Sequence, residues 1–124
     1  MQKKKPPAAR RVLIVEDEAA ISLMLEGLLN QLGYDVVGPA GDLGSALVLA
    51  DATKIDCGLL DVRLGADTVY ELAEILKRRR IPFVFATGYE NIETRFSDVP
   101  VVRKPFTERD IEGAIQKALS GARI

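Results

Sequence analysis

Five polar side chains follow four short apolar runs of this chain, at the point where each run ends. They are Glu16 and Asp17 after the first run, Asp61 after the second, Thr87 after the third and Lys104 after the fourth. If the four ends meet, carboxylates, a hydroxyl and an ammonium group can together bind a divalent cation and a phosphoryl group. A carboxylate can also accept that phosphoryl group as a nucleophile. The residue types therefore indicate phosphoryl-transfer chemistry, with Asp61 as the candidate acceptor.

The apolar runs predict parallel strands, because strands buried on both faces read as continuous apolar segments. These strands are expected at residues 12–15, 35–37, 57–60, 83–86 and 99–102. Apolar residues at helical spacing predict intervening and terminal helices at 21–32, 43–50, 72–80, 91–96 and 107–119. Five strand–helix units with short connections favour a doubly wound α/β fold with helices on both faces, flavodoxin-like, in strand order 2-1-3-4-5.

This strand order places the first and third strands side by side, so the pair Glu16-Asp17 becomes a neighbour of Asp61. Carboxylates packed together repel one another, and a hard divalent cation relieves the repulsion. Mg²⁺ is the predicted cofactor, because it prefers carboxylate and phosphate oxygens. The chain has no histidine, which excludes histidine-ligated metal sites and a phosphohistidine of its own. Lys104 is expected to neutralise one phosphoryl oxygen, and the Thr87 hydroxyl to reach another.

Length and composition limit the other function classes. A chain of 124 residues with 48% hydrophobic residues suits one domain with a sizeable core. The formal net charge of −1 and the lack of a long apolar stretch predict no nucleic-acid or membrane partner. The single cysteine, Cys57, fits a cytoplasmic location. The Lys- and Pro-rich residues 1–10 are expected to form a disordered tail, and residues 11–122 the folded domain.

Four segments together resemble the receiver domain of two-component response regulators: residues 12–18, 59–61, 86–88 and 101–106. The resemblance implies that Asp61 is the phosphoacceptor and that Thr87 and Lys104 contact the phosphoryl group. It also implies that Glu16 and Asp17 form the acidic pair for Mg²⁺, that the Arg63 backbone carbonyl contacts the metal, and that the Lys104–Pro105 peptide bond is cis.

The implied function is a phosphorylation-dependent signalling switch that is not an enzyme, expected as a single-domain response regulator, with the receiver part of a longer regulator as the alternative. A histidine kinase or phosphotransfer protein is the expected phosphoryl donor. A downstream protein is expected to recognise the face formed by the fourth helix, fifth strand and fifth helix.

Two positions depart from the usual receiver pattern. Val101 stands where receivers usually have a tyrosine or phenylalanine that takes part in the switch, and Gly65 stands where many have proline. The segment 82–89 resembles the FAT GUY subgroup of receivers, which is typical of alphaproteobacteria. Tyr89 is therefore the candidate for a relocated aromatic switch residue, with a surface aromatic as the alternative.

The same residues argue against three other functions. An adaptor with the receiver fold but no phosphorylation would not require the complete set of acids, Thr87 and Lys104. A haloacid-dehalogenase-type phosphatase would need a second aspartate two residues after Asp61, where Arg63 stands. Nucleotide or flavin binding would need a phosphate-binding loop, and the acids at residues 16–18 would repel a phosphate there.

Overall fold

A five-stranded parallel sheet forms the centre of this computed structural model, which describes residues 9–88 and 91–121. In sheet order its strands are β2 (Asp35–Ala40), β1 (Arg11–Val15), β3 (Cys57–Leu60), β6 (Phe83–Thr87) and β7 (Val101–Arg103). This is the predicted order 2-1-3-4-5, so the flavodoxin-like prediction is confirmed. The register pairs Val15 with Leu60 and Leu60 with Phe85, so the carboxyl ends of the central strands lie together at one edge.

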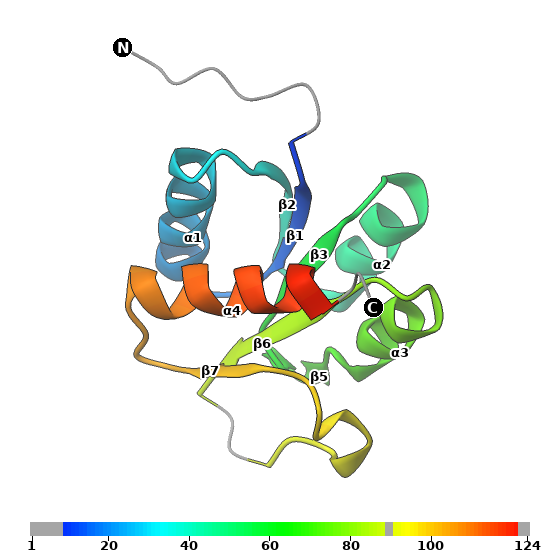
Figure 1. Cartoon of the computed structure of the whole chain (residues 1–124). Coiled ribbons are helices and arrows are strands. Elements are labelled where there is room, and N and C mark those ends of the chain that lie inside the picture. The colour runs from blue at the N-terminus through cyan, green and yellow to red at the C-terminus, as the bar shows by residue number, and fades with distance from the viewer. Residues whose placement is uncertain (1–8, 89–90, 122–124) are drawn as a thin grey trace.

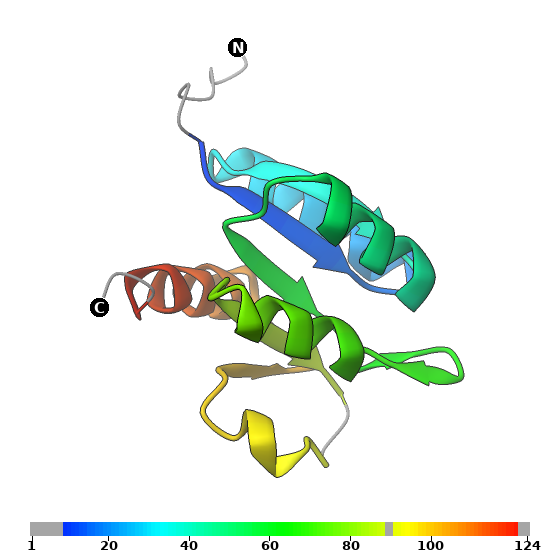
Figure 2. The same ribbon diagram turned by 90° about the vertical axis from the view of Figure 1, so that its right-hand side faces the viewer.

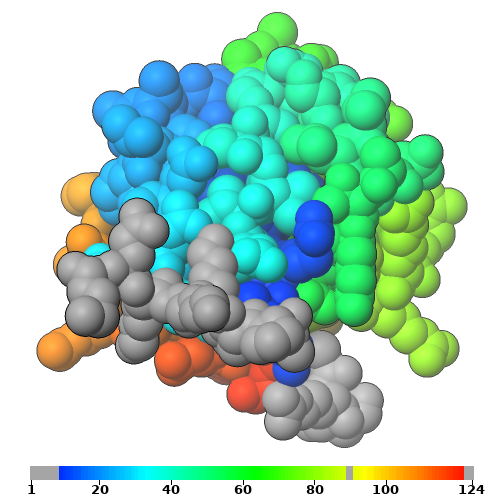
Figure 3. Space-filling view, turned by 90° about the horizontal axis from the view of Figure 1, so that it is seen from above, coloured from blue at the N-terminus to red at the C-terminus, as the bar shows by residue number. Residues whose placement is uncertain are grey.

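Helices cover both faces of the sheet (Figures 1 and 2). One face carries α1 (Ala19–Gln31) and α4 (Glu108–Gly121), and the other carries α2 (Leu43–Ala52) and α3 (Tyr70–Arg78). In the space-filling view from above, atoms of α1 and α4 lie to the left and bottom, and those of α2 to the upper right (Figure 3). Each face has its own apolar core, because alternate residues of the buried strands point to opposite sides.

Local sequence signals explain where the helices begin and end. Gly33 ends α1 in a left-handed conformation with φ +89°, which glycine adopts without steric cost. The Asp42 side chain accepts a hydrogen bond from the Ser45 backbone N–H at 2.7 Å and caps α2. At the start of α4, Thr107 and Asp110 each accept a hydrogen bond from the other's backbone N–H. These caps satisfy helix-end donors that would otherwise lack partners.

Most predicted elements differ from the observed ones by only one or two residues at their ends, and the larger differences are at one helix and one strand. Residues 91–96 were expected to form a helix, but only a 3₁₀ turn, η1 (Thr94–Phe96), forms there. The prediction was wrong because the segment is too short to stabilise an isolated helix and offers only Ile92 and Phe96 as apolar anchors. Strand β2 also continues through the cis Gly38–Pro39 bond to Ala40, beyond the expected end at residue 37.

A small β-hairpin between β3 and α3 was not expected from the sequence. It consists of β4 (Arg63–Leu64) and β5 (Asp67–Thr68), paired antiparallel and turned at Gly65 with φ +62°. Figure 2 shows this ribbon projecting beyond the carboxyl end of the sheet. The hairpin therefore places Arg63 and Gly65 beside the residues that end β1 and β3.

Candidate functional site

Backbone hydrogen bonds join the strand ends that carry the predicted site residues. The N–H of Asp61 donates to the carbonyl of Val15 at 2.9 Å, which holds the end of β3 against the end of β1. The N–H of Lys104 donates to the carbonyl of Thr87 at 3.1 Å, which does the same for β7 and β6. The polar side chains thus converge because the parallel register fixes their backbones at one edge of the sheet.

Lys104 contacts three carboxylates at this edge. Its Nζ donates to Asp61 Oδ2 at 2.8 Å and to Glu18 Oε1 at 3.1 Å, and lies 2.9 Å from Glu16 Oε1. The Asp61 side chain is 7% exposed and that of Glu16 is 1% exposed, whereas that of Glu18 is 62% exposed. The ammonium group therefore compensates two buried carboxylates and is shared with a third at the surface. The Lys104–Pro105 peptide bond is cis, as the receiver resemblance implied.

The electrostatics of this cluster shift two pKa values. Burial is the main cause that raises the pKa of Glu16, and the hydrogen bond from the Glu18 backbone N–H and the nearby Lys104 ammonium group only partly oppose it. Burial lowers the pKa of Lys104, but its contacts with the Asp61, Glu16 and Glu18 carboxylates outweigh this effect, so the net pKa is raised. Lys104 is consequently a permanent cation at neutral pH, while the ionised form of Glu16 is destabilised.

Four acids form a group that fits a hard divalent cation. One carboxylate oxygen from each of Glu16, Asp17, Glu18 and Asp61 lies within 4.8 Å of the others. Among the described residues, Glu16 Oε1 is buried and has no hydrogen-bond partner, although Lys104 Nζ lies 2.9 Å from it. An unsatisfied buried carboxylate oxygen in an all-oxygen donor set suits Mg²⁺ better than metals that need nitrogen or sulfur.

A hollow of about 410 Å³ opens beside these acids. Asp61, Arg63, Thr87 and Lys104 line it, together with Asp17, Glu18, Gly65 and Gly88. The hairpin is held to this site, since the Gly65 N–H donates to Asp17 Oδ2 at 3.0 Å. The structure thus gathers Asp17, Asp61, Arg63, Thr87 and Lys104 around one space, with Glu16 buried next to them.

One predicted switch position, Val101, does not line the hollow. Val101 lies on β7 with 36% of its surface exposed. Tyr89 lies outside the described residues. Glu18, in contrast, lines the hollow and binds Lys104, although the sequence analysis assigned it no role. Its place in the acidic run of residues 16–18, directly before α1, is the signal that points to it.

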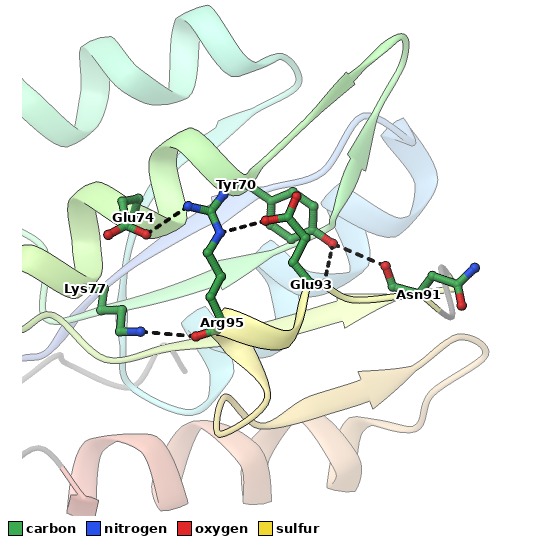
Figure 4. Close-up of polar contacts among 6 residues, drawn as sticks. All are labelled: Tyr70, Glu74, Lys77, Asn91, Glu93 and Arg95. Atoms are coloured by element: carbon green, nitrogen blue, oxygen red, sulfur yellow. Dashed lines mark hydrogen bonds and ion pairs between the residues drawn. The ribbon is translucent and has the colours of Figure 1, made fainter.

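Tyr70 is a second residue that the sequence analysis missed. Its hydroxyl donates to the Asn91 carbonyl at 3.5 Å and accepts from the Glu93 N–H at 3.1 Å (Figure 4). Its ring stacks on Phe96 with centroids 5.5 Å apart, and the Arg95 guanidinium lies over both rings. Tyr70 therefore attaches the segment that stands in place of the expected fourth helix to the start of α3.

Residues 12–116 match the family model of the response regulator receiver domain. The chain belongs to this family.

Named relatives agree with this assignment. The receiver is 37% identical over 117 residues to the transcriptional regulatory protein PdtaR of Mycobacterium tuberculosis, with 90% of this chain and 57% of the relative covered. It is 33% identical to the phyllosphere-induced regulator PhyR of Methylorubrum extorquens, with 90% of this chain and 44% of the relative covered. The receiver thus spans about half the length of these curated relatives.

Solved structures of similar receivers share the fold. SdrG from Sphingomonas melonis is 39% identical with a TM-score of 0.78, and the match covers 96% of this chain and 100% of SdrG. The receiver domain of PhyR from Erythrobacter litoralis is 32% identical with a TM-score of 0.80, and covers 90% of this chain and 91% of that domain. The similarity to PhyR and SdrG agrees with the FAT GUY resemblance of residues 82–89. Within the described residues, no helix is long and apolar enough to cross a membrane.

Proposed function

We propose that this receiver is a phosphorylation-dependent signalling switch in which Asp61 accepts a phosphoryl group from a phosphohistidine. The observation that supports it best is the contact of Asp61 Oδ2 with Lys104 Nζ at 2.8 Å, at the floor of an open hollow. A carboxylate that is buried on one side and open to a hollow on the other can be reached by a donor without unfolding the site. The donor is a histidine kinase or a histidine phosphotransfer protein.

In the transfer step, an Asp61 carboxylate oxygen attacks the phosphorus atom and a P–O bond forms. The P–N bond to the donor histidine breaks, and its electron pair returns to the imidazole nitrogen. Lys104 faces the negative charge that arrives on the phosphoryl oxygens, because its ammonium group already lies against Asp61. Its bond to the exposed Glu18 is the contact that exchanges most easily, since an exposed ion pair contributes little stability.

The acid group would hold Mg²⁺ through Asp17 and Asp61, with Glu16 beside them and the Arg63 backbone carbonyl as a further oxygen ligand. When bound, the ion would neutralise charge on the carboxylates and the phosphoryl oxygens. The Asp17 side chain also accepts a hydrogen bond from the Gly65 N–H, so the hairpin and a bound ion would share this carboxylate. The buried Glu16 supplies negative charge that attracts a cation to the site.

The response to phosphorylation is assigned to Thr87 and the segment that follows it. The Thr87 hydroxyl moves towards the phosphoryl group, and the displacement reorders residues 89–98, including Tyr89. The output surface consists of η1, β7 and α4, which correspond to the expected fourth helix, fifth strand and fifth helix. Val101 cannot act as an aromatic switch there, so the segment after Thr87 carries the change to a downstream protein.

The remaining assignments follow from this role. The protein catalyses no reaction of an external substrate beyond its own phosphorylation and dephosphorylation, and acts in the cytoplasm. Residues 11–122 form the receiver domain, and residues 1–10 a tail.

The experiment that tests this function is intact-protein mass spectrometry after incubation with acetyl phosphate and Mg²⁺. The wild type should gain one phosphoryl group, and alkali should remove it. Asp61→Asn should gain none, whereas Asp67→Asn, which removes an exposed acid of the hairpin, should be phosphorylated like the wild type. Equal labelling of Asp61→Asn and the wild type would reject Asp61 as acceptor.

A further inference from the structure

A second hollow lies far from Asp61, at the edge of the sheet where β6 and β7 begin. Figure 1 shows the end of α3, the start of β6 and the red end of α4 meeting there. Its volume is about 430 Å³; Phe83, Val99 and Ala118 contribute to an apolar floor, and Lys77, Arg80 and Lys117 to a basic rim. We propose that this amino-edge groove binds an acidic, amphipathic peptide segment of a partner protein.

The positive charge on the rim of the groove indicates that the bound segment is acidic. The rim carries three cations and one carboxylate, Asp98, whereas the whole chain has a net charge of −1. Positive charge is therefore concentrated at this edge, opposite the acidic group around Asp61. Within the described part of the chain, neither Arg80 nor Lys117 has an ion-pair partner. These two side chains are available to carboxylates of a partner, and electrostatic complementarity of this kind selects and orients an acidic segment.

The backbone of Arg80 supplies an independent observation. Arg80 adopts φ 60°, and it is the one residue other than glycine with positive φ in the described chain. Its N–H donates to the Lys77 carbonyl and the Ile81 N–H donates to the Leu76 carbonyl, which is the glycine-favouring end of a helix. At the end of α1 the chain uses Gly33 for the same conformation. An arginine at this strained position places a cation on the groove rim at the expense of stability, which favours a binding role.

The apolar floor determines which acidic ligand fits. Ile81, Pro82, Val99 and Pro100 are only partly buried, so the groove presents apolar surface to solvent between its charged side chains. A purely charged polyanion would leave this surface uncovered. A segment that alternates apolar and acidic side chains would bury apolar area on the floor and pair carboxylates with Arg80 and Lys117. Lys77 adds positive potential but already donates to the Arg95 carbonyl at 3.1 Å.

The binding experiment is an NMR titration of the ¹⁵N-labelled full chain with a short capped peptide that alternates leucine and glutamate. Amide resonances of Arg80, Ile81, Phe83, Asp98, Val99 and residues 117–121 should shift, and the affinity should fall as salt is added. A matched peptide with lysine in place of glutamate should cause no shift there. An RNA oligonucleotide is the competing polyanion. Shifts of these resonances by RNA but not by the acidic peptide, or equal binding of both peptides, would overturn the proposal.

Two arginine variants separate binding from folding. Arg80→Gly removes the rim cation and also relieves the left-handed strain, so the variant should unfold at a higher temperature while binding the peptide roughly two- to fivefold more weakly. Arg78→Gln removes the same charge from the last turn of α3 outside the groove and should leave the affinity unchanged. If both variants weaken binding equally, the effect is one of net charge and the groove assignment is wrong.

Discussion

Lys104 Nζ lies 2.8 Å from Asp61 Oδ2 and 2.9 Å from the buried Glu16 Oε1, so one ammonium group compensates two buried carboxylates. Replacing Lys104 with methionine should leave both buried carboxylates without a cation to compensate their charge. The free energy of unfolding of the metal-free chain should fall by about 2 kcal/mol, because uncompensated buried charge is costly. Urea denaturation measures this loss. Added Mg²⁺ should restore part of it in Lys104→Met; equal stability of the variant with and without Mg²⁺ would contradict this account.

Glu16→Gln should have the opposite effect on the metal-free chain. The raised pKa of Glu16 means that the folded state holds its proton more tightly than the unfolded state, whose pKa is near 4.5. This stabilising contribution is present below pH 4.5 and is lost as pH rises through the folded pKa. At neutral pH the neutral glutamine should therefore raise the free energy of unfolding relative to that of the wild type. Thermal unfolding from pH 4 to 8 should show that the difference from the wild type grows with pH across this window.

Mg²⁺ should stabilise the folded chain through its binding free energy. At a Mg²⁺ concentration about ten times the Kd, the gain should be about 1.4 kcal/mol. Asp17→Asn should remove most of this gain, whereas Asp67→Asn should keep it, because Asp67 lies on the hairpin outside the acid group. Melting temperatures with Mg²⁺ or with Na⁺ at matched ionic strength measure the effect. A similar rise in both buffers would indicate general screening and not a site.

Tyr70→Phe should loosen residues 91–96 without harming the acceptor site. The change removes the hydroxyl that bonds Asn91 and Glu93 but keeps the ring stacked on Phe96. The expected cost is about 1 kcal/mol, since the Glu93 N–H loses its partner. Hydrogen exchange of that amide should become faster, while acetyl phosphate should still modify Asp61. Unchanged exchange would mean that the Tyr70 hydroxyl does not hold this segment.

Tyr89→Ala should uncouple phosphorylation from the response. The substitution should leave modification of Asp61 nearly intact and reduce the change in residues 86–98. Hydrogen exchange with and without beryllofluoride, a phosphoryl mimic, measures that change in the wild type and the variant. A variant whose exchange responds to beryllofluoride as the wild type does would exclude Tyr89 as a switch residue.

The sequence alone determined the order of the strands and which polar side chains gather at their carboxyl ends. The reason is physical: buried parallel strands are apolar throughout, and short right-handed connections leave few topologies. Once the order is known, residues that end adjacent strands must be neighbours. The sequence could therefore place Asp17, Asp61, Thr87 and Lys104 at one edge of the sheet, because each lies within two residues of the end of a strand.

Only the tertiary structure decided which side chains form ion pairs with one another and which ones bind the backbone of an irregular segment. Glu18 binds Lys104 across 86 positions of the chain, and Tyr70 bonds a backbone more than twenty positions away. Such contacts depend on packing of one element against another and leave no periodic signal. The hairpin at Gly65 and the left-handed Arg80 belong to the same class. The left-handed conformation of Arg80 opposes the preference of a residue with a side chain, and the hairpin strands, at two residues each, are too short to give a periodic signal. The surrounding fold, not the local sequence, stabilises both.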